Sequence, residues 1–195
     1  RHVRWARRYE VRWNGGLVGD APVGAGPAGM FLAHLLHSQG VACTVIERRD
    51  RAYVEGRVRA GIVEPITVDL MRRLGLAGRL EREGLPHSGT NLSIDGEVFR
   101  IDLQALTGAQ VVVYGQQEVM HDLFEGAAVR GIPIVWDADQ VALHDLTGAR
   151  PAVTWMAAGI AHRLDCDFVV GCDGFHGVAR RSLPPETMRS YERVY

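Results

Sequence analysis

The chain has 195 residues, of which 47% are hydrophobic and 23% are charged, and its net charge is −1. This balance is typical of a soluble globular protein with one sizeable core, and it gives no overall reason to expect nucleic acid or a membrane as a partner. No apolar stretch reaches the roughly 18 to 20 residues of a membrane span. The three cysteines, Cys43, Cys166 and Cys172, have neither CxxC spacing nor a disulfide framework, which indicates a reduced, cytoplasmic protein.

The N-terminal segment carries five arginines within its first 12 positions, interleaved with tryptophan and tyrosine. Such a segment can bind nucleic acid through charge and base stacking. The alternative is a leader of unknown role over residues 1–16, outside the fold. We favour the leader because the rest of the chain is not basic. No apolar signal core follows it, so secretion is not expected.

A first strand is expected over residues 17–23, but its composition is unusual for the centre of a parallel sheet. Buried parallel strands are continuous apolar runs, whereas this segment contains Asp20 and Pro22. Proline cannot donate to a central ladder, and a buried carboxylate needs a partner. We therefore expect this strand to be weakened.

The turn that follows has the sequence of a dinucleotide-binding βαβ unit. Gly24 would make the tight turn, Gly26 would let backbone N–H groups approach a pyrophosphate, and Gly29 would let the next helix pack closely on the sheet. The helix is expected over residues 27–38, and the pyrophosphate would lie at the positive end of its dipole. Glu47, 18 residues after the last glycine, closes an apolar run and would accept hydrogen bonds from a ribose.

Periodicity and turn signals predict the remaining elements. An Asp-Gly pair at positions 95–96, flanked by alternating residues, predicts a β-hairpin over residues 91–101 that begins an antiparallel layer. Strands are expected over residues 111–114, 132–136, 140–144, 152–156 and 168–170. Two amphipathic helices are expected, residues 65–74 with Ile66, Leu70, Met71 and Leu74 on the apolar face, and residues 117–130 with Val119, Leu123, Ala127 and Val129.

Three further segments carry candidate ligand-binding residues. Arg57 and Arg59 stand between glycines, where guanidinium groups suit pyrophosphate or ribityl oxygens, although an exposed basic loop has the same composition. Gln116 follows a strand whose carboxyl end would open into a ligand crevice, or it simply starts the next helix. His176 and Arg180, after the last strand, would face an anionic second cofactor or lie on the surface. The sequence has no nucleophile elbow, HExxH motif or metal-ligand cluster, which argues against hydrolases and metalloenzymes.

Together these segments resemble the 4-hydroxybenzoate 3-monooxygenase family of single-component FAD-dependent aromatic hydroxylases. The resemblance runs from about Val23 to the last residue. It implies an α/β fold, namely a Rossmann-like FAD-binding domain with the start of an antiparallel β substrate layer, truncated. The segments that carry it are GAGPAG at 24–29, Glu47, residues 53–61, residues 113–116, residues 164–167 and GCDGFHG at 171–177.

The resemblance also implies roles for individual residues. In the family, NADPH reduces the flavin, and oxygen then hydroxylates 4-hydroxybenzoate to protocatechuate, while the protein orients the ring and excludes water. The residues matching the family's FAD contacts are Gly24, Gly26, Gly29, Glu47, Arg57, Val58, Arg59, Ala60, Gly61, Ile62, Gln116 and Asp173. Those matching its NADPH contacts are Arg48, Arg49, Tyr53, His176 and Arg180, where the two adjacent arginines would favour a 2′-phosphate.

We expect residues 17–195 to form an incomplete FAD-binding domain, with a hairpin near residues 88–102 belonging to the substrate layer. The family's substrate-binding residues and its later Gly-Asp flavin motif lie beyond this sequence, so we assign no catalytic residue and no metal. We expect the isolated chain to retain FAD weakly or not at all and to lack hydroxylation, and a full-length form to be compatible with a homodimer. Two alternatives stay open: an FAD hydroxylase of another phenolic acid, and a non-catalytic nucleotide-binding fragment.

Overall fold

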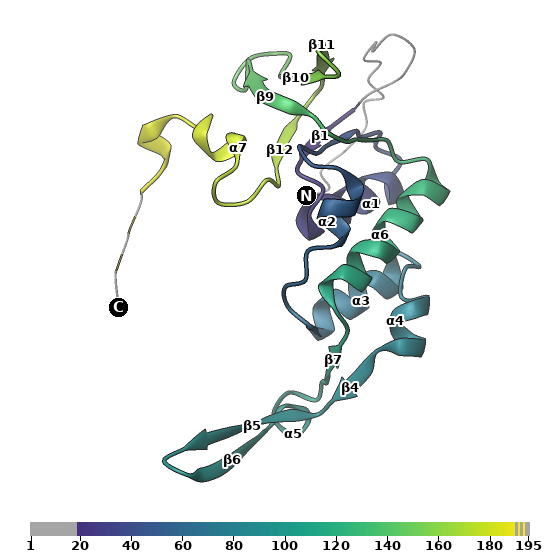
Figure 1. Cartoon of the computed structure of the whole chain (residues 1–195), viewed down its shortest axis with the longest axis vertical. Coiled ribbons are helices and arrows are strands. Elements are labelled where there is room, and N and C mark those ends of the chain that lie inside the picture. The colour runs from purple at the N-terminus through teal and green to yellow at the C-terminus, as the bar shows by residue number, and fades with distance from the viewer. Residues whose placement is uncertain (1–18, 190, 192, 194–195) are drawn as a thin grey trace, which may run out of the picture. The chain divides into compact units, whose positions relative to one another are not determined.

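The computed structural model describes residues 19–189, 191 and 193. The chain divides into two compact units: unit 1 comprises the described residues up to Asp50 and from Ile132 onward, and unit 2 comprises Arg51–Gly131. Figure 1 labels most of the elements of both units. The expected leader, residues 1–16, lies outside the described residues, as do the first two positions of the expected first strand. In the described part of the chain, no helix has the length and apolar character needed to cross a membrane.

Unit 1 is built on a four-stranded parallel sheet that carries the glycine turn. The strand order is β12-β1-β2-β8, and each neighbouring pair is parallel. Helix α1 connects β1 to β2 and has the bounds expected from the sequence, so the βαβ unit is confirmed. The elements around this sheet are β1 (Ala21–Val23), α1 (Pro27–Ser38), β2 (Val45–Ile46), β8 (Ile134–Val135), β12 (Val169–Gly171), α7 (Val178–Arg181) and the 3-10 helix η1 (Pro185–Thr187).

The first strand forms over Ala21–Val23 in spite of its proline, and the expectation that the strand is weakened stays a prediction. β1 lies between β12 and β2 in the sheet. The backbone N–H groups of Asp20 and Gly24 donate to the carbonyls of Ala42 and Ile46, at 2.9 and 2.8 Å. Backbone groups alternate in direction along a strand, so Pro22, like Asp20 and Gly24, faces the β2 side. Its missing N–H therefore removes only one bond from the β1–β2 ladder. The side chain of Asp20 is half-buried rather than enclosed, and burial raises its pKa.

A second, antiparallel sheet of unit 1 follows in the chain. It comprises β9 (Asp139–His144), β10 (Ala152–Ala157) and β11 (Ile160–Asp165), in the order β11-β10-β9. Strands β9 and β10 match the expectation, whereas β11 was missed. The β10–β11 turn consists of Ala158 and Gly159, both with positive φ (50° and 77°), and alanine is not a residue that signals such a turn.

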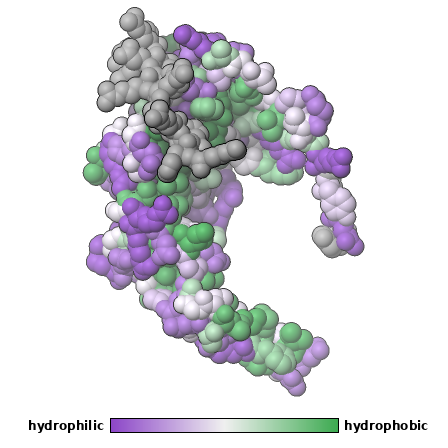
Figure 2. All heavy atoms as spheres, turned by 180° about the vertical axis from the view of Figure 1, so that it is seen from behind, coloured by the Kyte–Doolittle hydropathy of each residue, from purple (hydrophilic) through white to green (hydrophobic). Residues whose placement is uncertain are grey.

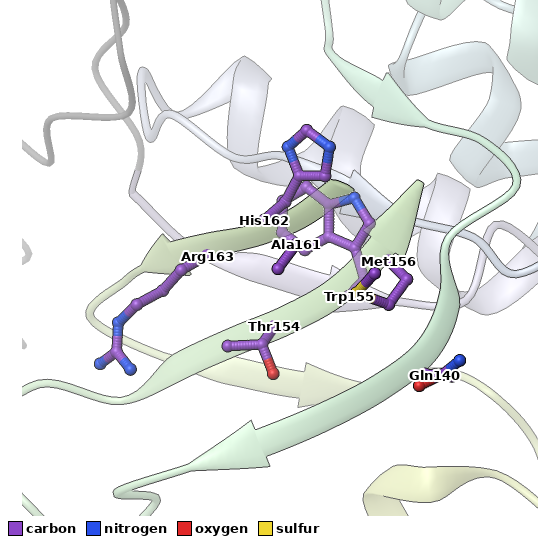
Figure 3. A pocket seen from close by; sticks show the side chains of 7 residues that line it. All are labelled: Gln140, Thr154, Trp155, Met156, Ala161, His162 and Arg163. Atoms are coloured by element: carbon purple, nitrogen blue, oxygen red, sulfur yellow. The ribbon is translucent and has the colours of Figure 1, made fainter. Parts of the chain in front are cut away.

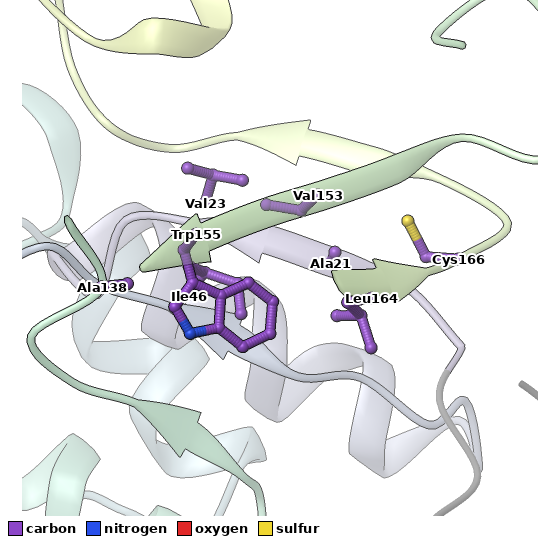
Figure 4. Packing of buried hydrophobic residues seen from close by; sticks show 8 residues of the cluster. All are labelled: Ala21, Val23, Ile46, Ala138, Val153, Trp155, Leu164 and Cys166. Carbon is purple, nitrogen blue, oxygen red and sulfur yellow. The ribbon is translucent and has the colours of Figure 1, made fainter. Parts of the chain in front are cut away.

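The hydrophobic core of unit 1 packs the two sheets against each other. Figure 4 shows Trp155 and Val153 of β10 beside apolar residues of β1 and β2. Burial of a large apolar side chain contributes about 1.5–3 kcal/mol, so this cluster fixes the antiparallel sheet on the strands that carry the glycine turn. The buried residues of the cluster are Ala21, Val23, Ile46, Ala138, Val153, Trp155, Leu164 and Cys166.

Unit 2 combines helices with short antiparallel strands. Strand β7 lies between β3 and β4 and is antiparallel to both. The segments 62–63 and 85–87, which pair with it, were not recognised as strands because each is only two or three residues long. The elements are α2 (Arg51–Glu55), β3 (Ile62–Val63), α3 (Pro65–Arg73), α4 (Gly78–Glu83), β4 (Leu85–His87), β5 (Gly89–Ile94), β6 (Glu97–Asp102), α5 (Leu103–Thr107), β7 (Val111–Val113) and α6 (Gln116–Arg130).

Two residues expected on buried helix faces are exposed. Ile66 of α3 is 79% exposed and Val129 of α6 is 88% exposed, whereas Val68, which we had not included, is 3% exposed. At 3.6 residues per turn, Val68 shares a face with Met71, but Ile66, five residues away from Met71, points elsewhere. Val129 is two residues from the buried Ala127 and therefore lies on the opposite side of α6.

The expected hairpin is confirmed. Asp95 and Gly96 join β5 to β6 with φ values of 51° and 85°, which are typical of a type I′ turn. Leu92 lies opposite Phe99, and the two side chains are 44% and 49% exposed. In Figure 2 the hairpin is marked by hydrophobic side chains at the bottom of the view. Because an isolated two-stranded hairpin is marginally stable, its exposed apolar face agrees with a role in a further layer, which stays a prediction.

Candidate dinucleotide-binding site

The structure gives each of the three glycines of the turn a different surrounding, and only two of the three positions exclude a side chain. Gly24 has φ +107°, and a Cβ there would lie 2.5 Å from the carbonyl oxygen of Cys172. A Cβ at Gly29 would overlap the carbonyl oxygen of Gly24, so α1 can approach the turn only without a side chain. A Cβ at Gly26 would meet no atom within 4 Å. Gly26 is therefore not required by packing, and its bare backbone borders open space.

Helix α1 begins directly after this open position. Its N-cap residue is Gly26, no side chain caps the helix, and Pro27 occupies the first turn. Proline lacks an N–H and is preorganised for this position, and the first turn contains no acidic residue. An uncapped helix N-terminus with no acidic residue in its first turn attracts an anion through its N–H groups and the helix dipole.

Glu47 follows β2 directly, and its side chain reaches the glycine turn. Its Oε2 accepts a hydrogen bond from the backbone N–H of Ala25 at 2.7 Å, and its Oε1 accepts one from Arg49 at 2.8 Å. Each carboxylate oxygen has two lone-pair directions, so each retains one for a further donor such as a ribose hydroxyl. The structure thus brings together the acid and the turn that the sequence associated only by spacing.

Asp173 also lies beside this turn, because β12 is the neighbour of β1. The N–H of Cys172 donates to the carbonyl of Val23 at 2.8 Å, and a Cβ at Gly24 would lie 2.9 Å from the Cα of Asp173. The Oδ2 of Asp173 accepts the N–H of Ala179 at 3.0 Å, next to the start of α7. The carboxylate therefore holds the chain from β12 into α7, as expected of a turn-shaping residue.

His176 and Arg180 meet on one exposed aromatic residue. The guanidinium carbon of Arg180 lies 4.0 Å from the centroid of the Phe175 ring, and the imidazole of His176 packs edge-on against it at 5.0 Å. Phe175 is 70% exposed, and the carbonyl of His176 accepts a hydrogen bond from Arg181 Nη1 at 2.6 Å. The two predicted residues thus form a basic, aromatic surface in unit 1.

In unit 2, the segment from Arg57 to Ile62 is exposed: residues 57–61 form a loop, and Ile62 begins β3. The loop is tied to the chain after β7 by two backbone hydrogen bonds: the N–H of Tyr114 donates to Gly61 at 2.9 Å, and the N–H of Gln116 donates to Ala60 at 3.0 Å. The structure therefore brings Gln116 next to the loop. Our reason for singling out Gln116 was wrong, however, because it follows a strand of an antiparallel sheet and not of a parallel one.

Arg48, Arg49 and Tyr53 are exposed. The backbone of Arg49 is held by Glu47 through the bond above, and its carbonyl accepts the N–H of Asp137 at 3.3 Å. In unit 2 the guanidinium carbon of Arg57 lies 5.5 Å from the ring centroid of Tyr53, a cation–π distance.

A buried polar cluster in unit 2 was missed by sequence reasoning. The hydroxyl of Tyr114 donates to Asp122 Oδ2 at 2.8 Å and accepts from Arg79 Nε at 3.2 Å. Arg79 also pairs with Asp122 Oδ1 at 3.3 Å and with Glu118. Burial and the hydrogen bond to Asp122 raise the pKa of the Tyr114 hydroxyl. No local pattern predicts this cluster, since Arg79 is 35 residues from Tyr114.

Each unit has a surface hollow whose lining includes none of the three glycines of the turn. In unit 1, a hollow of about 350 Å³ lies on the β9–β10–β11 sheet, where Trp155 and His162 stack with ring centroids 5.4 Å apart (Figure 3). In unit 2, a hollow of about 280 Å³ lies beside Gly56 and Gln117. Over residues 19–189, no group of three or more His, Cys, Asp or Glu side chains is placed to hold a metal ion.

Comparison with known proteins agrees with this geometry. The FAD binding domain family matches residues 21–195 of the chain. The chain is 43% identical over 176 residues to p-hydroxybenzoate hydroxylase from Acinetobacter baylyi, an alignment that covers 90% of this chain and 43% of that protein. It is 33% identical over 184 residues to 3-amino-4-hydroxybenzoate 2-monooxygenase from Streptomyces cremeus, with coverages of 87% and 43%.

Among solved structures, PqsL from P. aeruginosa superposes with a TM-score of 0.75 at 19% identity and covers 91% of this chain and 48% of its own. At that identity the similarity concerns the fold. The chain spans less than half the length of these relatives. Because the family match extends over nearly all of the described residues, the chain belongs to the FAD binding domain family.

Proposed function

We propose that this chain supplies the FAD-binding part of an NADPH-dependent monooxygenase that hydroxylates 4-hydroxybenzoate to protocatechuate. The 43% identity to p-hydroxybenzoate hydroxylase supports the choice of reaction and substrate. The observation that carries the proposal is the conjunction of Glu47, bonded to the N–H of Ala25, with the open backbone at Gly26. A ribose acceptor and an anion-binding helix start thus lie within one turn.

The residues present fit the pyrophosphate and ribose end of FAD. The N-terminus of α1 and the bare backbone at Gly26 would receive the pyrophosphate, while the remaining lone pairs of Glu47 would accept ribose hydroxyls. Asp173 would hold the β12 turn beside Gly24. Bound FAD would supply the redox and oxygen chemistry, for which protein side chains have no equivalent. We propose that Gln116 and the loop from Arg57 to Ile62 contact the flavin.

NADPH would be recognised by basic and aromatic groups on the exposed surface. Arg48 and Arg49 are adjacent and exposed, and two guanidinium groups favour a 2′-phosphate over a hydroxyl. Tyr53 would contribute on unit 2. His176 and Arg180, assembled on Phe175, would bind another charged part of the same cofactor.

A pair of glycine variants tests FAD binding. In Gly26→Ala the added methyl group meets no protein atom within 4 Å, so the chain should fold normally, yet it occupies the space proposed for the pyrophosphate. We expect FAD affinity to fall by about tenfold or more, which corresponds to roughly 1.4 kcal/mol. Gly78→Ala is the matched control. Gly78 begins another helix, α4, and a Cβ there makes only an ordinary 3.7 Å contact with Arg82.

The measurement is titration of the chain with FAD, followed by flavin fluorescence, with circular dichroism as the test of folding. ADP-ribose should displace FAD, since the turn and Glu47 address its pyrophosphate and ribose. Equal FAD affinities for Gly26→Ala and Gly78→Ala would contradict the proposed cradle. The titration of the unchanged chain also tests the prediction that the chain alone retains FAD weakly or not at all.

A second candidate is an FAD hydroxylase of another phenolic acid. It is favoured by the 33% identity to an enzyme named for an aminated hydroxybenzoate. Product analysis with 4-hydroxybenzoate and its 3-amino derivative, using a form that includes the substrate-binding part, separates the two. Tight nucleotide binding without NADPH oxidation in such a form would instead support the non-catalytic alternative.

A further inference from the structure

The exposed loop from Arg57 to Ile62 is held, at its end next to β3, by the backbone around a buried tyrosine, Tyr114. Its residues Ala60 and Gly61 accept the backbone N–H groups of Gln116 and Tyr114, at 3.0 and 2.9 Å. These bonds continue the β3–β7 ladder past its last pair, in which Ile62 lies opposite Val113. The position of the loop backbone thus depends on where the chain at 114–116 is held.

The side chain of Tyr114 is what holds that segment. The residue is only 4% exposed, although its neighbours in β7 are half-buried. Its hydroxyl lies between two elements, donating to Asp122 of α6 at 2.8 Å and accepting from Arg79 of α4 at 3.2 Å. The guanidinium carbon of Arg79 also lies 5.9 Å from the centre of the Tyr114 ring.

Each partner in this cluster is itself fixed by charge. Asp122 is 9% exposed and accepts from Tyr114 with one oxygen while Arg79 approaches the other at 3.3 Å. Arg79 pairs in addition with Glu118 of α6 and lies 3.5 Å from Glu83 of its own helix. A buried group with charged hydrogen-bond partners is costly to displace, because moving it leaves a carboxylate or guanidinium unpaired.

We propose that Tyr114 is a positioning residue for flavin binding. Its buried hydroxyl, held by Asp122 and Arg79, fixes the position of the backbone at Gln116 and thereby the position of the Arg57–Ile62 loop. The inference deepens the proposed function and rests on it for the identity of the ligand. The mechanical part, in which the hydroxyl determines the order of the loop, can be measured without any ligand.

The first test is amide hydrogen exchange in Tyr114→Phe, without FAD. The variant keeps the ring and removes only the hydroxyl. We expect the amides at positions 114 and 116 to exchange about tenfold faster or more, because their hydrogen bonds to the loop open more often, whereas the amide of Ala127 in α6 changes little. Tyr191→Phe is the matched control, since Tyr191 is 85% exposed.

A general loss of stability would look different, because exchange would then rise equally at Ala127. Unchanged exchange at 114 and 116, or a uniform rise that includes Ala127, overturns the proposal. Asp122→Asn is the second variant and covers the case in which Tyr114→Phe does not fold. It keeps an acceptor for the tyrosine hydroxyl but removes the charge facing Arg79. We therefore expect a smaller local rise in exchange at positions 114 and 116, and the absence of any rise would contradict the proposal.

The second test adds FAD. We expect Tyr114→Phe to bind FAD about tenfold more weakly and to shift its flavin absorbance bands relative to the unchanged chain, with Tyr191→Phe unaffected. Normal FAD binding and spectrum in Tyr114→Phe would overturn the positioning role. If the unchanged chain binds no FAD, the comparison is repeated in a form that includes the substrate-binding part, where failure to bind FAD would overturn the proposed function. The exchange data decide in either case whether the hydroxyl orders the loop.

Discussion

Replacement of Gly29 by alanine is the sharpest test of how the glycine turn is built. The Cβ of an alanine at this position would overlap the carbonyl oxygen of Gly24 and lie 3.3 Å from the Cβ of Cys172. Real Cβ atoms almost never come within 3.0 Å of such a group, and ordinary contact begins at 3.4 Å. Since the oxygen belongs to backbone, α1 or the turn must move by more than about 1 Å to accommodate the methyl group.

That movement disturbs a closely packed part of unit 1. Met30 and Ala33 of α1 are fully buried, and the turn is bonded to β2 through the N–H of Gly24 at 2.8 Å. Overpacking that forces backbone shifts costs about 1–3 kcal/mol, and we expect Gly29→Ala to lie at the upper end of this range. Gly26→Ala should cost less than about 0.5 kcal/mol, because no atom lies within 4 Å of its Cβ.

The assay is urea denaturation followed by tryptophan fluorescence. Unit 2 contains no tryptophan, so the emission reports on the rest of the chain, including Trp136 and the buried Trp155. Gly29→Ala should unfold at a clearly lower urea concentration than Gly26→Ala and the unchanged chain. If Gly29→Ala proves as stable as Gly26→Ala, the close approach of α1 to the turn is not what this glycine provides.

Further outcomes follow from burial. Because burial raises the pKa of Asp20, its ionisation costs the folded state stability as the pH rises above the ordinary value of 3.8. Asp20→Asn should therefore be more stable than the unchanged chain at pH 7 but not below pH 3.8, and urea midpoints at both pH values would refute this if they showed no pH-dependent gain. Burial raises the pKa of Cys43 to about 11 and of Cys166 to about 12, so both thiols should resist iodoacetamide at pH 8 until the chain is unfolded; mass spectrometry showing rapid native labelling would contradict it. Leu92→Thr and Phe99→Thr should each change stability by less than about 0.5 kcal/mol while reducing binding of an apolar dye, since both side chains are about half exposed; a large loss of stability would show that this hairpin face is packed in solution.

Elements that depend on local patterns could be predicted from the sequence. The bounds of α1 matched because the signals that set them, namely the glycine turn, the proline at the helix start and the glycine after its end, all lie within residues 24–40. The hairpin over β5 and β6 matched because Asp95 and Gly96 select a turn type by their own backbone preferences. Strand β11 was missed because Ala158 adopts a positive φ that alanine does not signal.

Pairing between distant segments could not be predicted in the same way. The contacts that hold β1 were not foreseen: the strand contains Pro22, yet the remaining ladder and the core cluster of Ile46, Val153 and Trp155 keep it between two neighbours. The orientation of β7 was also misjudged, because its partners β3 and β4 are too short to be recognised alone. In both cases the outcome depends on packing free energy summed over segments far apart in the chain.

The sequence by itself determined the dinucleotide-binding unit: a turn that only glycine can form, a helix start suited to an anion, and an acid at the end of the next strand. These are properties of backbone conformation and of residue spacing within about 25 positions. Only the tertiary structure decided that Asp173 lies beside Gly24, that Glu47 is bonded to the N–H of Ala25, and that Tyr114 is locked by Asp122 and Arg79. Such contacts join groups that no local preference brings together; they form because burying a polar group is tolerated only where another element supplies its partner.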